Sequence, residues 1–139
     1  MLGNADIVDM LLAAGASTDV YDYDDITPLV MSLFADDDNI AKMLINSGAD
    51  VNSLTHENYT ALHHAAWHGR IEAVQLLLDS GARDDDRTHD GNTPLALAAH
   101  GGFSNVLQLL IRRGCCVNNS DKSVLVKLLF IYLVCFLYI

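Results

Sequence analysis

The chain of 139 residues is poor in basic side chains, with 8 lysines and arginines against 18 aspartates and glutamates. A surface that binds nucleic acid needs clustered lysine and arginine to neutralise phosphates. The net charge of −10 therefore argues against a nucleic-acid partner. The acidic residues fall in runs such as YDYDD and RDDDR. Such runs form either solvated loops or an acidic recognition patch.

Cysteine is also scarce, and Cys115, Cys116 and Cys135 form neither an evenly spaced framework nor a CxxC motif. This usage indicates reduced intracellular thiols. The first residues, MLGNADIVDMLLAAGAS, lack a basic region and carry aspartates within their apolar stretch. A secretory signal is therefore not expected. Together these features predict a protein of the cytosol or nucleus.

The motifs of common catalytic sites are missing too: the sequence has no G-x-S-x-G elbow and no GxxxxGK[ST] loop. His64 and His68 are four residues apart and can share a helix face, as zinc-binding histidines do. No acidic third ligand lies at a matching spacing, and Gly69 follows at once. We expect no enzyme activity, no metal site and no cofactor.

A pattern that returns every 33 residues is what the sequence does contain. Glycines stand at positions 15, 48, 81 and 114, and threonines at 27, 60 and 93 keep the same interval. The stretch NYTALHHAAWHGRIEAVQLLLDSGA is followed by GNTPLALAAHGGFSNVLQLLIRRGC in the same register. A fixed period of this length indicates an array of stacked structural repeats.

Each repeat predicts two short helices and a loop. Thr60 can cap a helix over ALHHAAWH, and prolines follow the equivalent threonines at the first helical position. After Gly69, a second helix over IEAVQLLLDS places Ile71, Val74, Leu77 and Leu78 on one face. Gly81 suits the left-handed residue at its end. One hairpin cannot bury both faces, so neighbours must stack.

The arrangement resembles the ankyrin repeat, whose units carry Thr-Pro-Leu-His-x-Ala-Ala, a glycine and then Val-x-x-Leu-Leu-x-x-Gly-Ala. The matching stretches are TALHHAA…G…VQLLLDSGA and TPLALAA…G…VLQLLIRRG, with a weaker TPLVMSL…IAKMLINSGADVN before them. The resemblance covers roughly residues 3 to 119. It implies an all-α ankyrin-repeat solenoid of stacked helix-turn-helix units with projecting loops. It also implies a non-catalytic scaffold or adaptor that binds another protein on its concave face.

The boundaries follow from this register. We expect a partial unit over 3–21, units over about 22–54, 55–87 and 88–119, and a C-terminal tail over 120–139. The partial unit looks like a second helix alone, so the apolar side of Ile7, Val8 and Leu11 would lack half of its hairpin. A truncated sequence or an alternative transcript is favoured over a frayed end. In the second unit Asp36 replaces the usual glycine, which predicts a looser turn.

Partner-binding positions are carried over from the resemblance, as loop tips and first-helix residues. They are Tyr23, Asp24, Ile26 and Phe34 in the second unit, His56, Glu57, Tyr59, Trp67 and His68 in the third, and His89, Asp90, Asn92 and His100 in the fourth. Tryptophan and tyrosine are enriched in binding hot spots. Trp67 is the only tryptophan, and it either contacts the partner or packs against Tyr59 or a neighbouring helix.

Two further roles are implied by the resemblance. His63 is the one family histidine that this chain retains, since Val30 and Ala96 take its place elsewhere, and it is expected to hydrogen-bond neighbouring loops. Asn52 is a candidate for hydroxylation by an iron-dependent asparaginyl hydroxylase. The alternative, in which Asn52 only shapes its loop, is favoured.

The C-terminal tail departs from the repeat, because VLVKLLFIYLVCFLYI (residues 124–139) is apolar apart from Lys127. A membrane span needs about 20 apolar residues, so this stretch is marginal. Three interpretations stay open: a non-native end from alternative splicing or a gene-model error, a short anchor that tethers the adaptor to the cytoplasmic face of a membrane, or an apolar cap on the last repeat.

Overall fold

The computed structural model describes residues 4–35 and 37–115, together with residues 129 and 133. This part of the chain contains seven helices and no strand. The helices are α1 (Asn4–Ala13), α2 (Pro28–Phe34), α3 (Asp38–Asn46), α4 (Ala61–Trp67), α5 (Ile71–Asp79), α6 (Pro94–Gly101) and α7 (Ser104–Arg112).

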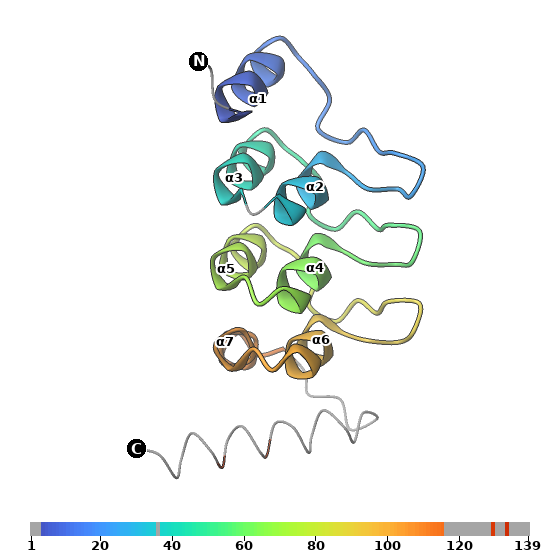
Figure 1. The fold of residues 1–139 in the computed structure, drawn as a ribbon, viewed down its shortest axis with the longest axis vertical. Helices are drawn as coiled ribbons and strands as arrows, with labels where there is room; N and C mark the ends of the chain where they lie inside the picture. Colours follow the sequence, from blue (N-terminus) through green and yellow to red (C-terminus); the bar gives the residue numbers. More distant parts are fainter. Residues whose placement is uncertain (1–3, 36, 116–128, 130–132, 134–139) are drawn as a thin grey trace.

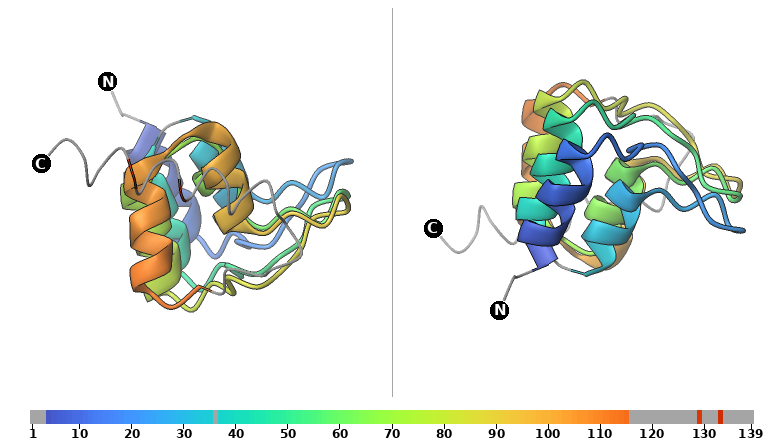
Figure 2. Two further views of the ribbon diagram at one scale, coloured as in Figure 1. Left: turned by 90° about the horizontal axis from the view of Figure 1, so that it is seen from below. Right: turned by 90° about the horizontal axis from the view of Figure 1, so that it is seen from above.

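The helices form two layers. The inner helices α2, α4 and α6 lie one above another, and the outer helices α1, α3, α5 and α7 form a parallel column beside them (Figure 1). The long loops that join one hairpin to the next project together from the side of the inner helices (Figure 2). This is the all-α stack of hairpins with projecting loops that the repeat predicts.

The three inner helices begin as the sequence predicts. Thr27, Thr60 and Thr93 have extended backbone, and each hydroxyl accepts a hydrogen bond from the backbone N–H three residues ahead. Pro28 and Pro94 take the first helical position. These caps satisfy a backbone N–H that would otherwise lack a partner at a buried helix end.

The core lies between consecutive hairpins. In the third unit Val74 and Leu77 are fully buried, and Ile71 and Leu78 are partly buried against them, as their spacing predicts. Small side chains are buried where helices come close, as at Ala65 and Ala66 in α4, Ala73 in α5 and Ala98 and Ala99 in α6. Each inner helix is therefore covered by its own outer helix and by the neighbouring units.

Two consecutive turns also interlock. Gly69 has φ of +68°, and the Phe103 ring occupies the space in which a Cβ at Gly69 would lie. The same ring lies against Gly101, so it fills the gap between the turn of one unit and the turn of the next. Glycine at 69 is therefore required both by its backbone conformation and by this close approach.

The projecting loops are joined by backbone hydrogen bonds that follow the repeat. The N–H of His56 donates to the carbonyl of Asp24 (3.2 Å), and the N–H of His89 donates to the carbonyl of Glu57 (3.0 Å). At the opposite end of the first two loops, a side chain joins one loop to the next. In the first pair, the carboxylate of Asp19 accepts a hydrogen bond from the N–H of Asp50. These bonds hold the loop tips in a fixed order along one side of the stack.

The N-terminal helix has a neighbour on one side only. α1 packs on α3, no residue of α1 is buried, and Ile7, Met10 and Leu11 are exposed. Among the described residues, no inner helix precedes α1 in the way that α2 precedes α3 (Figure 1). The exposure of Ile7 and Leu11 agrees with the expectation that this apolar side lacks half of its hairpin.

The turn expected to be loose lies partly outside the described residues, because Asp36 itself is not described. On either side of it, the N–H of Asp37 donates to the carbonyl of Ser32 at 3.0 Å. The equivalent bonds in the next two units, Arg70 to Ala65 and Phe103 to Ala98, measure 2.9 and 3.0 Å. The flanking residues therefore close the turn as tightly here as in the other units.

The apolar tail falls almost wholly outside the described residues, so the anchor, cap and non-native interpretations of residues 124–139 stay predictions. Among the helices that the structure describes, none is long and apolar enough to cross a membrane.

Arg70 joins the second and third units and gives a test of their coupling. Its guanidinium is mostly buried, donates to the carbonyl of Leu33 (2.8 Å) and pairs with Asp38. We expect Arg70→Ala to lower the free energy of unfolding by about 1–2 kcal/mol, because it removes charged hydrogen bonds at a largely buried site. Urea unfolding followed by circular dichroism measures this loss. Arg112→Ala changes an exposed residue of α7 and serves as the control, so it should change the free energy of unfolding little. An equal loss of unfolding free energy in both variants would contradict this role of Arg70.

Candidate functional site

The residues expected to bind a partner lie on the inner helices and the projecting loops. The side chains of Tyr23, Asp24, His56, Glu57, His89 and Asp90 at the loop tips are exposed, and those of Ile26, Tyr59 and Asn92 are partly buried. On the inner helices and the residue following α4, Phe34, Trp67, His68 and His100 are exposed. The inner helices and the loops share one side of the stack (Figure 1), and we call the residues predicted on these elements the loop face.

His63 links the third unit to the loop that follows it. The N–H of Thr60 donates to His63 Nδ1 (3.1 Å), so Nδ1 is the acceptor and the proton of the neutral ring sits on Nε2. From Nε2 the ring reaches two backbone carbonyls, those of Asp86 (3.1 Å) and Asn92 (3.2 Å). The role in joining neighbouring loops that the resemblance implies is therefore present in the geometry.

The charge state of His63 follows from this environment. Its side chain is fully buried, and burial lowers its pKa, while the carbonyls of Asn92 and Asp86 act in the opposite direction. Protonation would also place a second proton on Nδ1, facing the N–H of Thr60. The neutral ring is therefore the form that fits the fold.

His64, the next residue, lies among aromatic rings. Its ring meets Phe34 edge-on (centroids 4.9 Å apart) and lies tilted against Tyr59 (5.2 Å). Burial, with additional repulsion from His68 and His63, lowers the pKa of His64 to about 4. Its Nε2 is shielded from solvent and has no hydrogen-bond partner. His64 is thus a neutral imidazole at pH 7 with an unused nitrogen.

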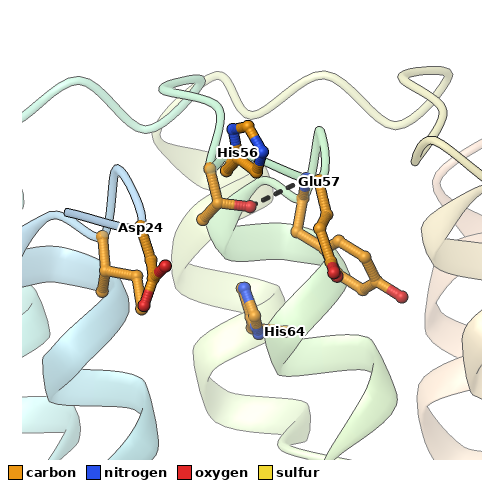
Figure 3. Close-up of a pocket in the computed structure, with 7 residues that line it drawn as sticks. Asp24, His56, Glu57 and His64 are labelled. Atoms are coloured by element: carbon orange, nitrogen blue, oxygen red, sulfur yellow. Dashed lines mark hydrogen bonds between the residues drawn. The ribbon is translucent and has the colours of Figure 1, made fainter.

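A pocket of about 330 Å³ opens beside His64, between two consecutive loops. Asp24 and Ile26 line it from the first loop, and Thr55, His56, Glu57 and Tyr59 line it from the second. In Figure 3 the His64 ring lies below the loops, with Asp24 on one side and Glu57 on the other. The N–H of Tyr59 donates to the Thr55 hydroxyl (3.2 Å), which fixes the second loop beside the pocket.

Apolar side chains continue the loop face along the inner helices. Met31, Phe34 and Trp67 are 53%, 47% and 49% exposed. Phe34 also meets the ring of His68 edge-on, with centroids 6.1 Å apart, so the C-terminal ends of α2 and α4 contact each other through these side chains. Trp67 has half of its surface available to a partner, while Tyr59 makes its ring contacts with His63 and His64.

The structure brings together some of the expected residues and leaves others apart. Asp24, Ile26, His56, Glu57 and Tyr59 line one pocket. The fourth-unit residues His89, Asp90, Asn92 and His100 lie outside it, and the backbone of Asn92 serves the fold by accepting hydrogen bonds from His63 and Thr88. Tyr23 points into solvent at a loop tip.

Two lining residues were missed from the sequence, Thr55 and His64. His64 was considered only as a zinc ligand, by its spacing from His68. The repeat could have singled out His64. Met31 and Leu97 occupy the equivalent positions 33 residues before and after it, so a polar ring at this inner-helix position is unusual within the chain. Within the described residues, no group of three His, Cys, Asp or Glu side chains is arranged to hold a metal ion.

Asn52 uses both ends of its amide within the stack. Its Oδ1 accepts from the N–H of Arg83 (2.8 Å), and its Nδ2 donates to the carbonyl of Gly81 (3.2 Å). These bonds join two consecutive loops, the role of Asp19 one unit earlier. Such contacts fit the loop-shaping interpretation, and hydroxylation of Asn52 stays a prediction.

Comparison with known protein families gives two matches. Residues 1–88 match the family described as "Ankyrin repeats (3 copies)", and residues 68–111 match "Ankyrin repeats (many copies)". No curated protein sequence matches the chain.

The buried His63 and the partly buried His64 are expected to lower the stability of the fold in mild acid. Their unfolded pKa is near 6.5, as for any histidine. Because their folded pKa values are lower, the unfolded chain binds more protons as the pH falls through this range. Their contribution is complete above about pH 6.5 and is lost progressively toward the folded values, about 4 for His64.

His64→Phe isolates one of these contributions and keeps a planar ring. Between pH 6.5 and 5, the variant should lose less unfolding free energy than the wild type by about 1–2 kcal/mol. Urea unfolding at the two pH values measures the difference. A wild-type curve no steeper than that of His64→Phe would refute the assignment of a low pKa to His64.

Proposed function

The chain belongs to the ankyrin repeat family, and we propose that it is a non-catalytic scaffold or adaptor that binds another protein on its loop face. Ankyrin repeats are in general protein–protein interaction modules. The single observation that carries the finer proposal is the exposure of Met31, Phe34 and Trp67 on inner helices, beside exposed loop tips. Aromatic side chains that are accessible at a fixed position provide large contact area at low entropic cost.

The chemistry of the loop face suggests the kind of partner. Its loop-tip segments 20–27, 53–60 and 86–93 contain no lysine and one arginine, Arg87, against the acids Asp22, Asp24, Asp25, Glu57, Asp86 and Asp90. Complementary charge speeds encounter and selects among partners. We propose a partner surface that combines basic side chains with apolar ones, the latter meeting Phe34 and Trp67.

The proposal assigns no catalytic role to His63 or His64. His63 uses both ring nitrogens in hydrogen bonds that hold the fold. His64 has no acid, base or nucleophile as a hydrogen-bond partner, since its Nε2 is unpaired. The hydrogen-bonded nucleophile–base pair that is typical of a covalent catalytic site is not among these contacts.

Partner capture tests the loop face directly. The tagged full chain is compared with Tyr59→Ala/Trp67→Ala, after circular dichroism shows equal folding, and bound proteins are identified by mass spectrometry. We expect at least one protein to be recovered by the wild type and lost, or reduced about tenfold or more, with the double variant, as for the loss of two aromatic contacts.

A matched control separates the loop face from the rest of the surface. Lys42→Ala/Gln75→Ala changes two side chains on the outer helices α3 and α5. This control should recover the same proteins as the wild type. If Tyr59→Ala/Trp67→Ala retains every protein that the wild type captures, the loop face is not the binding surface.

A further inference from the structure

The pocket between the first two projecting loops is acidic at its rim. Of its lining residues, Asp24 and Glu57 are carboxylates on separate loops, both exposed, and none is lysine or arginine. This charge also affects the neighbouring Tyr59. Burial, together with the negative charges of Glu57 and Asp90, raises the pKa of its hydroxyl. A positively charged group that enters the pocket is therefore attracted from two sides.

The floor of the pocket favours a flat cation. Tyr59 and His64 lie against each other there, with ring planes inclined by 36°. Positive groups bind over aromatic faces by interaction with the ring quadrupole. His64 adds no opposing charge, because its ring is neutral at pH 7. It also carries a ring nitrogen that no group in the described chain pairs with.

The size of the pocket limits what it can hold. Its 330 Å³ lies at the lower end of the range for small-molecule sites, about 300–1,000 Å³. The space suits one side chain rather than an extended cofactor. The pocket is partly open to solvent, so a side chain of a bound protein can enter it.

We infer that this pocket receives the guanidinium of an arginine side chain presented by the protein partner, with Asp24 and Glu57 as its counter-ions. The inference rests on the proposed function, since it names the chemistry of the partner at one point of the loop face. A guanidinium is planar, weakly hydrated and carries five N–H donors, so it can stack on an aromatic floor and meet carboxylates on two sides. An ammonium group has neither the plane nor the breadth.

Binding of N-acetyl-arginine amide to the full chain tests the site without a known partner. Backbone amides of residues 55–59 are followed by ¹H–¹⁵N nuclear magnetic resonance during titration. We expect saturable shifts with a dissociation constant in the millimolar range, and about tenfold weaker binding of N-acetyl-citrulline amide, the neutral isostere. Equal binding of the two compounds, or no shift with the arginine compound, would overturn the inference.

Paired variants test the two carboxylates. Asp24→Asn/Glu57→Gln should weaken arginine-amide binding about five- to tenfold, the effect expected for the loss of two exposed ion pairs. The control Glu72→Gln/Asp85→Asn makes the same chemical changes at exposed positions outside the pocket. An equal loss in both pairs would mean that net charge alone attracts arginine, and the pocket would be refuted as its site.

Failure of the arginine pocket can be distinguished from failure of the loop face as a protein-binding surface. If a partner is lost with Tyr59→Ala/Trp67→Ala but bound equally by Asp24→Asn/Glu57→Gln, the loop face stands and the arginine pocket falls. If arginine amide binds in the pocket while capture is unaffected by Tyr59→Ala/Trp67→Ala, the pocket stands as a cation site and the proposed adaptor surface falls.

Discussion

Burial between consecutive helical hairpins is the interaction on which the rest of this molecule depends. A hairpin of two short helices exposes apolar residues on both sides, so each unit is stable only with a neighbour against it. In the third unit this burial is complete at Leu62, Ala65, Val74 and Leu77. At the N-terminal end, α1 has a neighbour on one side, and its apolar residues Ile7, Met10 and Leu11 stay exposed. The contrast shows that stacking, rather than helix propensity, buries the core.

Stacking also determines the geometry of the loop face. Each loop receives hydrogen bonds from the next through its backbone and through Asp19 or Asn52. In the third unit His63 adds a bond from inside the helix layer to the following loop. Ordered loops lower the entropy that binding must overcome, because their side chains are already held near one arrangement. The pocket between Asp24 and Glu57 exists because two loops are kept at a constant separation.

Differences among the repeats give the face its character. At the position of His63, the flanking units carry Val30 and Ala96, which are buried and form no such link. At the position of His64 they carry Met31 and Leu97, so the neutral imidazole occurs once. The third unit therefore combines a histidine link to the following loop with the polar floor of the pocket. Replacement of a few inner-helix residues, on an unchanged scaffold, is enough to make one site along a repeating surface.

Much of the fold was predictable from the sequence because its determinants are local. Thr60 before ALHHAAWH, Gly69 between the helices and Gly81 after the second one specify caps and turns through backbone chemistry that neighbouring residues supply. The pocket was not predictable in the same way. Asp24 and Glu57 are 33 positions apart, and their shared orientation depends on how two loops stack. Likewise, the spacing of His64 and His68 raised a metal role only for it to be rejected, and spacing alone does not reveal that the His64 ring contacts Phe34 and Tyr59.

The central claim concerns two neutral imidazole rings. His63 joins consecutive units of the stack, and His64 forms part of the floor of the pocket. Long-range ¹H–¹⁵N correlation spectra of the histidine rings, recorded from pH 7.5 to 5, test it directly because they report tautomer and protonation for each ring. The account predicts that His63 keeps its proton on Nε2 and gains a second proton only below the ordinary histidine pKa, and that His64 remains neutral at pH 5.5. If either ring gains a proton with a midpoint near 6.5, the ordinary value, or if His63 carries its proton on Nδ1, the account is contradicted.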